Sequence, residues 1–239
     1  MLTNTIRRIV MKKLILPILL ALITAFSMTA CGQSEKTTSY AQPTLPSITD
    51  KSGTGYNVQD DGTLTVASAD KKAKEIVVPE SFQGKKVTKL AKSAFKMCKA
   101  EKITLPESVK SIDDYTFAFC RDLKEIKLPS KIKKIGQNCF AGCSSLKTLK
   151  LPKGIKTIDI FAFDGSGLES ITIPEAVKTV KSFAFAECEG LREVIFEGKS
   201  TEIEEKAFKD SDSVTITAPK GSAALTYAED NNISCKAKK

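Results

Sequence analysis

Residues 105–127 read LPESVKSIDDYTFAFCRDLKEIK, and residues 128–150 read LPSKIKKIGQNCFAGCSSLKTLK. The two segments have the same length and the same spacing of apolar residues, so they are two copies of one unit. Looser copies on both sides extend the pattern over residues 76–219, about six copies in all. Successive copies after the first are separated by 22 or 23 residues. A period of this size is typical of solenoid proteins.

The apolar positions of the unit explain why several copies are needed. Positions are counted from the opening apolar residue of the unit, which is Leu105 in the first segment above and Leu128 in the second. Position 13 is phenylalanine in every copy: Phe95, Phe117, Phe140, Phe163, Phe185 and Phe208. Positions 8 and 22 are aliphatic in every copy. One unit of this length cannot enclose these side chains, whereas stacked units share a continuous core. We therefore expect the phenylalanines to form a column through that core.

The tract around position 22, LKEIKLP in residues 123–129, alternates in polarity and precedes a proline. It predicts a short strand, ended by a residue that cannot donate to a ladder. One strand per copy predicts a parallel sheet along one face. On the other face, DDYTFAFC (113–120) and GQNCFAGC (136–143) predict short helical or 3₁₀ turns. The predicted fold class is therefore α/β, a strand-dominated solenoid.

The unit L-P-x-x-[VI]-x-x-I-x-x-x-A-F-x-x-C-x-x-L-x-x-I resembles the bacterial leucine-rich repeats of the BspA-like class, found on surface proteins of many host-associated bacteria. Departures are Glu197 in place of the proline and Ser166 and Ser211 in place of the cysteine. Residues 55–68 resemble the hairpin that often opens such arrays, and residues 218–232 resemble the terminal cap. The resemblance implies a leucine-rich-repeat solenoid that acts at the cell surface as a non-catalytic binding or adhesion module for a protein or glycan.

The N-terminus has the layout of a secretory signal peptide. Two lysines follow Met11, residues 14–26 are apolar, and small residues precede Cys31. The apolar stretch is shorter than the roughly 20 residues that span a bilayer, so we expect cleavage, with residues 1–30 as signal peptide and Met11 as the natural start. Residues 28–31, MTAC, resemble a bacterial lipobox, which implies that Cys31 is lipidated. A plain secretory peptide with an incidental Cys31 is the alternative.

The remaining segments follow from composition. Residues 31–53 are polar, contain two prolines, and predict a flexible tether behind the lipidated cysteine. Residues 54–75 alternate around Asp61 and Gly62 and predict a hairpin that caps the first repeat. Repeats occupy residues 76–219, and residues 220–239 form a cap and tail. The expected location is an exported lipoprotein, held to the membrane by its N-terminal lipid, on the extracytoplasmic cell surface.

Composition excludes several functions. The chain has no histidine, which removes Ser-His and Cys-His catalysis and histidine metal sites. No set of carboxylates, lysines or thiols forms a recognisable catalytic group, so we expect no enzyme activity, no cofactor and no metal. Nucleic acid is not an expected partner, because the protein is exported and no aromatic residues alternate with its basic ones.

Cysteine recurs at position 16, as Cys98, Cys120, Cys143 and Cys188. A residue that recurs once per repeat is usually a small buried filler. Two alternatives are a disulfide between Cys120 and Cys143, which neighbouring repeats would bring close enough, and a metal site. The metal site is the weaker alternative, because the sequence contains no C-x-x-C pair. The paired acids at residues 60–61 and 113–114 are turn residues first, with calcium as a remote alternative.

Charge supplies the candidate binding residues. After residue 30 the chain holds 33 basic and 28 acidic residues, a net charge of +5. Position 6 is lysine in four successive copies, namely Lys110, Lys133, Lys156 and Lys178, while Lys127 and Lys150 lie on the predicted strand face. The row is either a solvated edge or a contact stripe for an anionic glycan or an acidic protein patch. A structural or accessory envelope protein without an external ligand is the alternative function.

Overall fold

The computed structural model describes residues 48–238. The predicted signal peptide, Cys31 and all of the predicted tether up to residue 47 lie outside this part. The described residues belong to one compact unit. Its first strand, β1 (Ile48–Thr49), falls inside the segment predicted as tether and pairs with the strand that follows.

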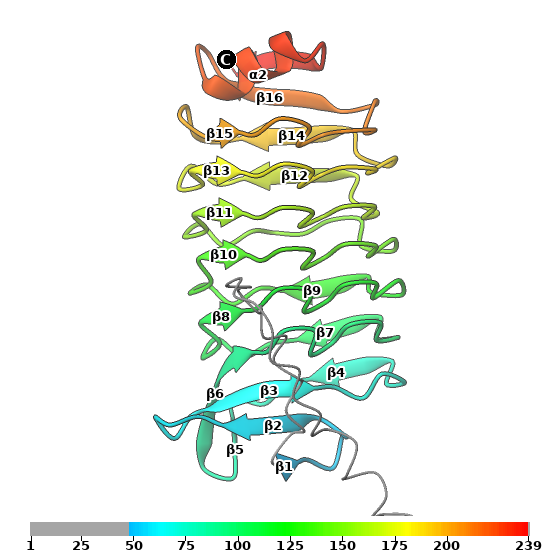
Figure 1. The fold of residues 1–239 in the computed structure, drawn as a ribbon, viewed down its shortest axis with the longest axis vertical. Coiled ribbons are helices and arrows are strands. Elements are labelled where there is room, and N and C mark those ends of the chain that lie inside the picture. Colours follow the sequence, from blue (N-terminus) through cyan, green and yellow to red (C-terminus); the bar gives the residue numbers. More distant parts are fainter. Residues whose placement is uncertain (1–47, 239) are drawn as a thin grey trace, which may run out of the picture. The chain divides into compact units, whose positions relative to one another are not determined.

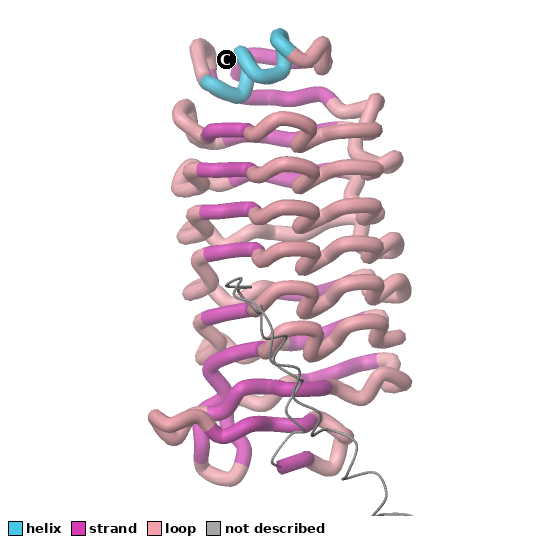
Figure 2. Tube along the Cα trace, viewed as in Figure 1, coloured by secondary structure: helices cyan, strands magenta, loops and turns pink. Residues whose placement is uncertain are grey.

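The described residues form a strand-dominated solenoid of about eight turns (Figures 1 and 2). The other strands are β2 (Gly55–Val58), β3 (Leu64–Ser68), β4 (Glu75–Val77), β5 (Ser81–Phe82), β6 (Lys85–Leu90), β7 (Lys102–Thr104), β8 (Ser111–Ile112), β9 (Glu125–Lys127), β10 (Lys134–Ile135), β11 (Thr157–Ile158), β12 (Ser170–Ile173), β13 (Thr179–Val180), β14 (Glu193–Phe196), β15 (Glu202–Ile203), β16 (Thr215–Pro219) and β17 (Ser234–Lys238). The helix α2 spans Ala223–Asp230.

The strands predicted at position 22, together with β17 from the segment predicted as cap and tail, form a parallel sheet in two stretches. The first is β4-β7-β9 and the second is β12-β14-β16-β17. Between them, a single bridge from Thr148 to Ser170 replaces a full strand pair. Successive strands keep position 22 in register, for example Ile103 opposite Ile126 and Val194 opposite Ile216. The register follows from burial, because a shift by one residue would turn every apolar side chain to solvent.

A second set of parallel strands lies on another face, where the sequence predicted none. Position 8 lies in β8, β10, β11, β13 and β15, and β10-β11-β13-β15 form a four-stranded ladder. In the N-terminal part, β8 pairs with β6. The pattern was missed because each of these strands is only two residues long, too short for alternation to be recognised.

The face predicted to hold short helical or 3₁₀ turns consists of non-helical turns, so the helical face and the α/β description are not confirmed. Two residues in each turn have positive φ: Ser93 and Met97, Tyr115 and Phe119, Asn138 and Gly142, Phe161 and Gly165, Phe183 and Glu187, Lys206 and Asp210. A right-handed helix cannot contain them. Within one turn, the Ala118 N–H donates to Tyr115 at 3.1 Å, whereas the Phe117 N–H donates to Cys139 of the next turn at 3.0 Å. Hydrogen bonds between turns thus replace those of a helix.

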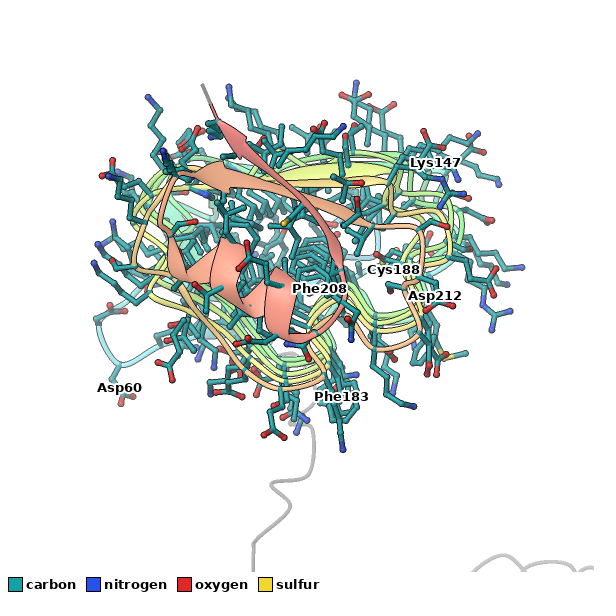
Figure 3. The ribbon with its side chains drawn as sticks, turned by 90° about the horizontal axis from the view of Figure 1, so that it is seen from above. Asp60, Lys147, Phe183, Cys188, Phe208 and Asp212 are labelled. Atoms are coloured by element: carbon teal, nitrogen blue, oxygen red, sulfur yellow. The ribbon has the colours of Figure 1, made fainter. Side chains whose placement is uncertain are left out.

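The phenylalanine column runs through the core as the sequence predicted. Neighbouring rings of position 13 have centroids 5.1 to 5.6 Å apart from Phe95 to Phe208. Each of these side chains is at most 5% exposed. Seen along the stack, Phe208 and Cys188 lie inside the ring of strands, whereas Phe183 projects outward (Figure 3).

Both ends of the stack are covered. At the N-terminal end, the antiparallel strands β2 and β3 form a hairpin, and β3 pairs in parallel with β6. There the buried Tyr56 ring stacks on Phe82 at 5.0 Å. At the C-terminal end, α2 begins at the N-cap Ser222 and buries Ala224 and Ala228. In the described part of the chain, α2 is the only helix.

Candidate ligand-binding surfaces

The structure brings the four lysines of position 6 to one edge, immediately before the strands of the second sheet. The backbone N–H of Lys156 donates to Lys133, and that of Lys178 donates to Lys156. These three lysines therefore stack turn on turn, at the spacing of about 4.8 Å that separates paired strands. The next residue of the row is Thr201, which is buried and donates its hydroxyl to the Val177 carbonyl at 3.0 Å. The row ends there.

All four lysines of this row are exposed. Within residues 48–238, none of them is within 4.0 Å of a carboxylate, whereas nine other lysines form ion pairs: Lys74, Lys89, Lys102, Lys124, Lys127, Lys134, Lys147, Lys181 and Lys209. Lys110 is near enough to Asp61 for its charge to contribute to a lowered pKa of that carboxyl, which two hydrogen bonds from Thr63 lower most. The row is thus a line of cations that the protein leaves largely uncompensated.

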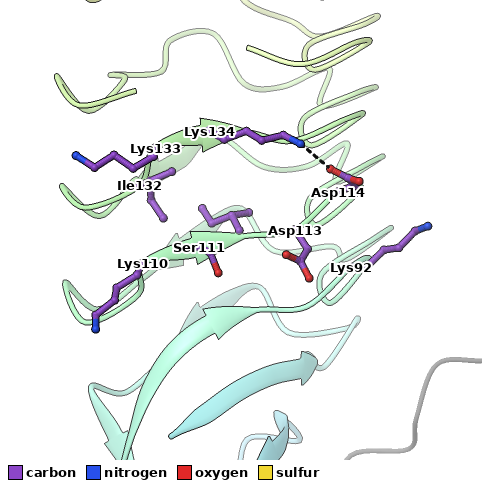
Figure 4. Close-up of a pocket in the computed structure, with 9 residues that line it drawn as sticks. Lys92, Lys110, Ser111, Asp113, Asp114, Ile132, Lys133 and Lys134 are labelled. Atoms are coloured by element: carbon purple, nitrogen blue, oxygen red, sulfur yellow. Dashed lines mark ion pairs between the residues drawn. The ribbon is translucent and has the colours of Figure 1, made fainter. Parts of the chain in front are cut away.

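A hollow of about 330 Å³ lies beside the row, between β8 and β10 (Figure 4). In the described chain these two strands are neighbours that form no ladder. Lys110 and Lys133 stand at one end of the hollow, and Asp114 and Lys134 lie at the other. Its walls are completed by Lys92, Ser111, Ile112, Asp113 and Ile132. The hollow therefore separates Lys110 from Lys133 within the row.

Lys127 and Lys150 lie apart from the row, on the main sheet. Lys127 is exposed and pairs with Glu107 at 3.6 Å. Lys150 lines a shallow hollow of about 450 Å³ at the break between the two stretches of that sheet. The six lysines that the sequence singled out therefore form two groups. The second group is the weaker candidate, because one of its members already has a carboxylate partner.

The sequence reasoning missed an aromatic column on the turn face. Phe161 and Phe183 are half-buried and stack with centroids 5.0 Å apart. Lower on the same face, Lys92 and Lys96 lie 5.5 and 5.7 Å from the centre of the Tyr115 ring. The signal was present as an aromatic residue at position 11 in three copies. Because stacked rings turn their faces toward each other, the column offers ring edges to a ligand, which is poor geometry for stacking on a sugar.

A buried carboxylate joins three turns beside the second sheet. The Asp159 side chain is 9% exposed, and it lies 2.6 Å from the Lys134 ammonium and 3.0 Å from that of Lys181. Burial opposes ionisation of this carboxyl. Its hydrogen bonds with Lys134, the Ile160 N–H and Lys181 outweigh that effect and lower its pKa. Asp159 is thus a structural group whose charge is compensated.

The cysteines of position 16 are buried thiols, as the repeat pattern predicted. Cys143 donates to the carbonyl of Phe117 at 3.1 Å, and Cys188 donates to that of Phe163 at 3.1 Å. Burial raises the pKa of the Cys143 thiol to about 12. Among the residues that the structure covers, no three His, Cys, Asp or Glu side chains are grouped to hold a metal ion.

The paired acids serve the fold. Asp113 lies 3.1 Å from the Lys89 ammonium, Asp114 accepts from the Gln137 N–H at 3.0 Å, and Asp61 accepts from the Thr63 N–H at 2.9 Å.

None of the helices from residue 48 to residue 238 has the length and apolar character needed to cross a membrane.

Stacked turns, one phenylalanine per turn and parallel strands define the class of this protein, a leucine-rich-repeat solenoid. The family model for the BspA type leucine-rich repeat region matches six copies over residues 88–215. The chain belongs to this family. Proteins built on such repeats are generally non-catalytic. Comparison with curated protein sequences finds no match.

Three bacterial leucine-rich repeat proteins of known structure are similar to this chain, and the first of them supports the fold. A leucine-rich repeat protein from Bacteroides ovatus superposes with a TM-score of 0.55 at 23% identity over 70% of this chain. The match spans 58% of the length of that protein. A leucine rich cell surface protein from Faecalibacterium prausnitzii gives a TM-score of 0.42 at 18% identity, over 71% of this chain and 75% of its own. The leucine-rich repeat protein of T. pallidum gives 0.46 at 24%, over 71% and 70%.

Proposed function

We propose that this protein is an exported, lipid-anchored binding module without catalytic activity, and that the lysine row holds an anionic glycan or wall polymer at the cell surface. The observation that carries the proposal is the row itself. Lys133, Lys156 and Lys178 repeat at the pitch of the solenoid and have no carboxylate partner in the described structure. A linear polymer with regularly spaced negative charges is the ligand whose geometry fits such a line.

The energetics of the row support a weak, multivalent contact. Two ammonium groups about 5 Å apart repel each other by roughly 0.8 kcal/mol in water, and a polyanion lying along the row relieves this repulsion. Each exposed lysine contributes little by itself, because its charge is screened and its side chain loses entropy on binding. Several contacts along one polymer add to an avidity that no single lysine supplies. We therefore expect micromolar or weaker affinity with a strong dependence on salt.

Binding is tested by replacing the row with glutamate. The variant carries Lys110→Glu, Lys133→Glu, Lys156→Glu and Lys178→Glu. It is titrated beside the wild type against heparin and a purified teichoic acid, at low and physiological salt. The wild type should bind more weakly as salt rises, and the variant should bind at least about tenfold more weakly, equivalent to 1.4 kcal/mol. Thermal denaturation establishes that both proteins are folded.

A second variant controls for net charge. It carries the same four charge reversals at exposed lysines outside the row: Lys51, Lys99, Lys199 and Lys220. If position decides binding, this control should retain most of the affinity of the wild type. Equal losses of affinity in the two variants would mean that the overall charge, and not the position of the lysines, determines binding. If the wild type does not bind at low salt, the row is a solvated edge and the accessory envelope function gains support.

Anchoring is tested at Cys31. The MTAC motif at residues 28–31 supports the expectation that this cysteine is acylated and becomes the first residue of the mature chain. Replacement by alanine should abolish labelling with a palmitate analogue and move the protein from the membrane fraction to the soluble exported fraction. The control is Cys235→Ala, which removes a thiol near the C-terminus and should leave both readouts unchanged. Labelling that survives Cys31→Ala would contradict the lipoprotein proposal.

A further inference from the structure

Two cysteine side chains near the N-terminal end of the core lie closer together than any other thiols in the described structure. The Sγ atoms of Cys98 and Cys120 are 3.1 Å apart. Both side chains are buried, with 2% and 0% exposure. They occupy position 16 in consecutive turns, where paired backbones are spaced at about 4.8 Å. This lies within the range of Cα separations, about 4.4 to 6.8 Å, that a disulfide accepts.

The hydrogen bonding of the column explains why these two thiols meet. The position 16 side chains of later turns donate to the phenylalanine carbonyl one turn earlier, as Cys143 does to Phe117 and Ser211 does to Phe185. Cys98 lies in the first turn of the column, and no earlier turn has a phenylalanine at position 13 whose carbonyl could accept from its thiol. Its sulfur therefore contacts Cys120, whose own thiol lies 3.0 Å from the Phe95 carbonyl.

The other cysteines lack such a partner. Ser166 separates Cys143 from Cys188 in the column, and Cys188 lies 3.4 Å from its hydroxyl. In the part of the chain that the structure covers, the Cys143 thiol donates to the Phe117 carbonyl and forms no hydrogen bond with a second sulfur. The pairing of Cys120 with Cys143, which the sequence left open, is thus the less favourable one.

We propose that Cys98 and Cys120 form a disulfide when the protein folds outside the cytoplasm, and that this bond fastens the first two complete repeats to each other. The thiolate of one cysteine attacks the disulfide of a thiol oxidoreductase or of glutathione disulfide. A mixed disulfide forms and one thiol leaves. The second cysteine then attacks the mixed disulfide, the Cys98–Cys120 bond forms, and a second thiol leaves. The two cysteines lose two electrons and two protons, and the oxidant gains them.

Burial determines when the exchange can occur. In the folded stack, contact with the Cys120 thiol lowers the pKa of the Cys98 thiol, but neither sulfur is then accessible to an oxidant. Because both sulfurs are buried once the repeats have stacked, exchange takes place during folding. The bond closes a loop between residues 98 and 120, and a loop of this size restricts the unfolded chain appreciably.

Peptide mapping tests the proposal directly. The full-length chain is unfolded in urea and refolded in a buffer of reduced and oxidised glutathione. It is then blocked with N-ethylmaleimide in denaturing urea, so that buried thiols also react, and digested with trypsin without reduction. Trypsin releases Cys98 in residues 97–99 and Cys120 in residues 111–121. We expect these two peptides to be joined and two hydrogens lighter than their sum. Residues 135–147, which hold Cys139 and Cys143, and residues 182–192, which hold Cys188, should carry the maleimide.

Stability provides a second readout that does not depend on peptide recovery. Reduction with dithiothreitol should lower the melting temperature of the oxidised wild type by about 5 to 10 °C. Cys98→Ser should show no response to the reductant, whereas Cys188→Ser should respond like the wild type. Maleimide on both Cys98 and Cys120 after refolding, or a peptide that joins Cys120 to Cys143, would overturn the proposal. Because mapping uses the wild-type chain, the proposal stays testable even where a serine variant fails to fold.

Discussion

At the residue scale, the repeat depends on single side chains that each contact the equivalent side chain of the neighbouring turns. Phe140 is fully buried, and its ring lies 5.2 Å from Phe117 and 5.6 Å from Phe163. Interiors of this kind are packed as densely as organic crystals, so the loss of one ring leaves a cavity that neighbours fill only in part. A phenylalanine in the middle of the column therefore contributes to the stability of three turns.

Phe140→Ala should destabilise the protein by about 3 to 5 kcal/mol, since it combines lost burial with a cavity. The matched control is Phe119→Ala on the same turn face, where the side chain is 42% exposed and the cost should be under about 1.5 kcal/mol. Urea denaturation of both variants and the wild type measures the difference. Equal costs at the two positions would mean that the column does not carry the core.

At the element scale, neighbouring turns are joined by contacts that cross from one turn to the next. The turn face uses backbone hydrogen bonds, and the second sheet adds ion pairs beside its short strands. Asp159 is the central case, because it contacts Lys134 of the preceding turn and Lys181 of the following one. Both lysines are about half exposed, so solvent screens the pairs and limits what each contributes.

Asp159→Asn should lower the free energy of unfolding by about 1 to 2 kcal/mol at pH 7. Native contacts lower the pKa of Asp159, so the carboxylate stabilises the fold above its unfolded pKa of about 3.9. This contribution is lost as the pH falls through the lower folded pKa. Urea denaturation at pH 7 and pH 3 should therefore show a difference that shrinks in acid. Asp212→Asn, at an exposed residue without an ion pair in the described structure, is the control and should change stability little.

At the scale of the whole molecule, the stack is a one-dimensional array in which each turn contacts its neighbours. Stability in such arrays is approximately a sum over repeats and the interfaces between them. The last interface is covered by α2 and β17, with the Tyr227 ring 6.1 Å from Phe208 and β17 in register with β16. Without this cap, the apolar end of the stack would face water.

Truncation after Pro219 should consequently loosen the C-terminal turns and leave the N-terminal ones intact. Hydrogen exchange followed by mass spectrometry should show lost protection in β14 to β16 and nearly unchanged protection in β7 and β9. Tyr227→Ala in the complete chain is a milder change and should reduce protection from exchange only in the last turn. Uniform loss of protection from β4 to β16 would show that the solenoid unfolds as one cooperative unit.

The repeat pattern alone was enough to predict the solenoid, the stacked phenylalanines and the parallel strands at position 22. A period of 22 or 23 residues with one apolar register allows only a shared core, and burial fixes that register. The lysine row followed from the same periodicity, because residues of equal position must stack. The stacking of the cysteines at position 16 followed from the periodicity in the same way.

Only the tertiary structure decided features that depend on contacts between turns. Tyr115 and Phe183, for example, adopt positive φ while their N–H groups donate to Gln137 and Lys206 of the adjacent turn, a cause that local propensity does not contain. The same holds for the hollow between β8 and β10 and for the choice of Cys98 as the partner of Cys120. Sequence periodicity determined which residues stack, and three-dimensional packing determined how closely they meet.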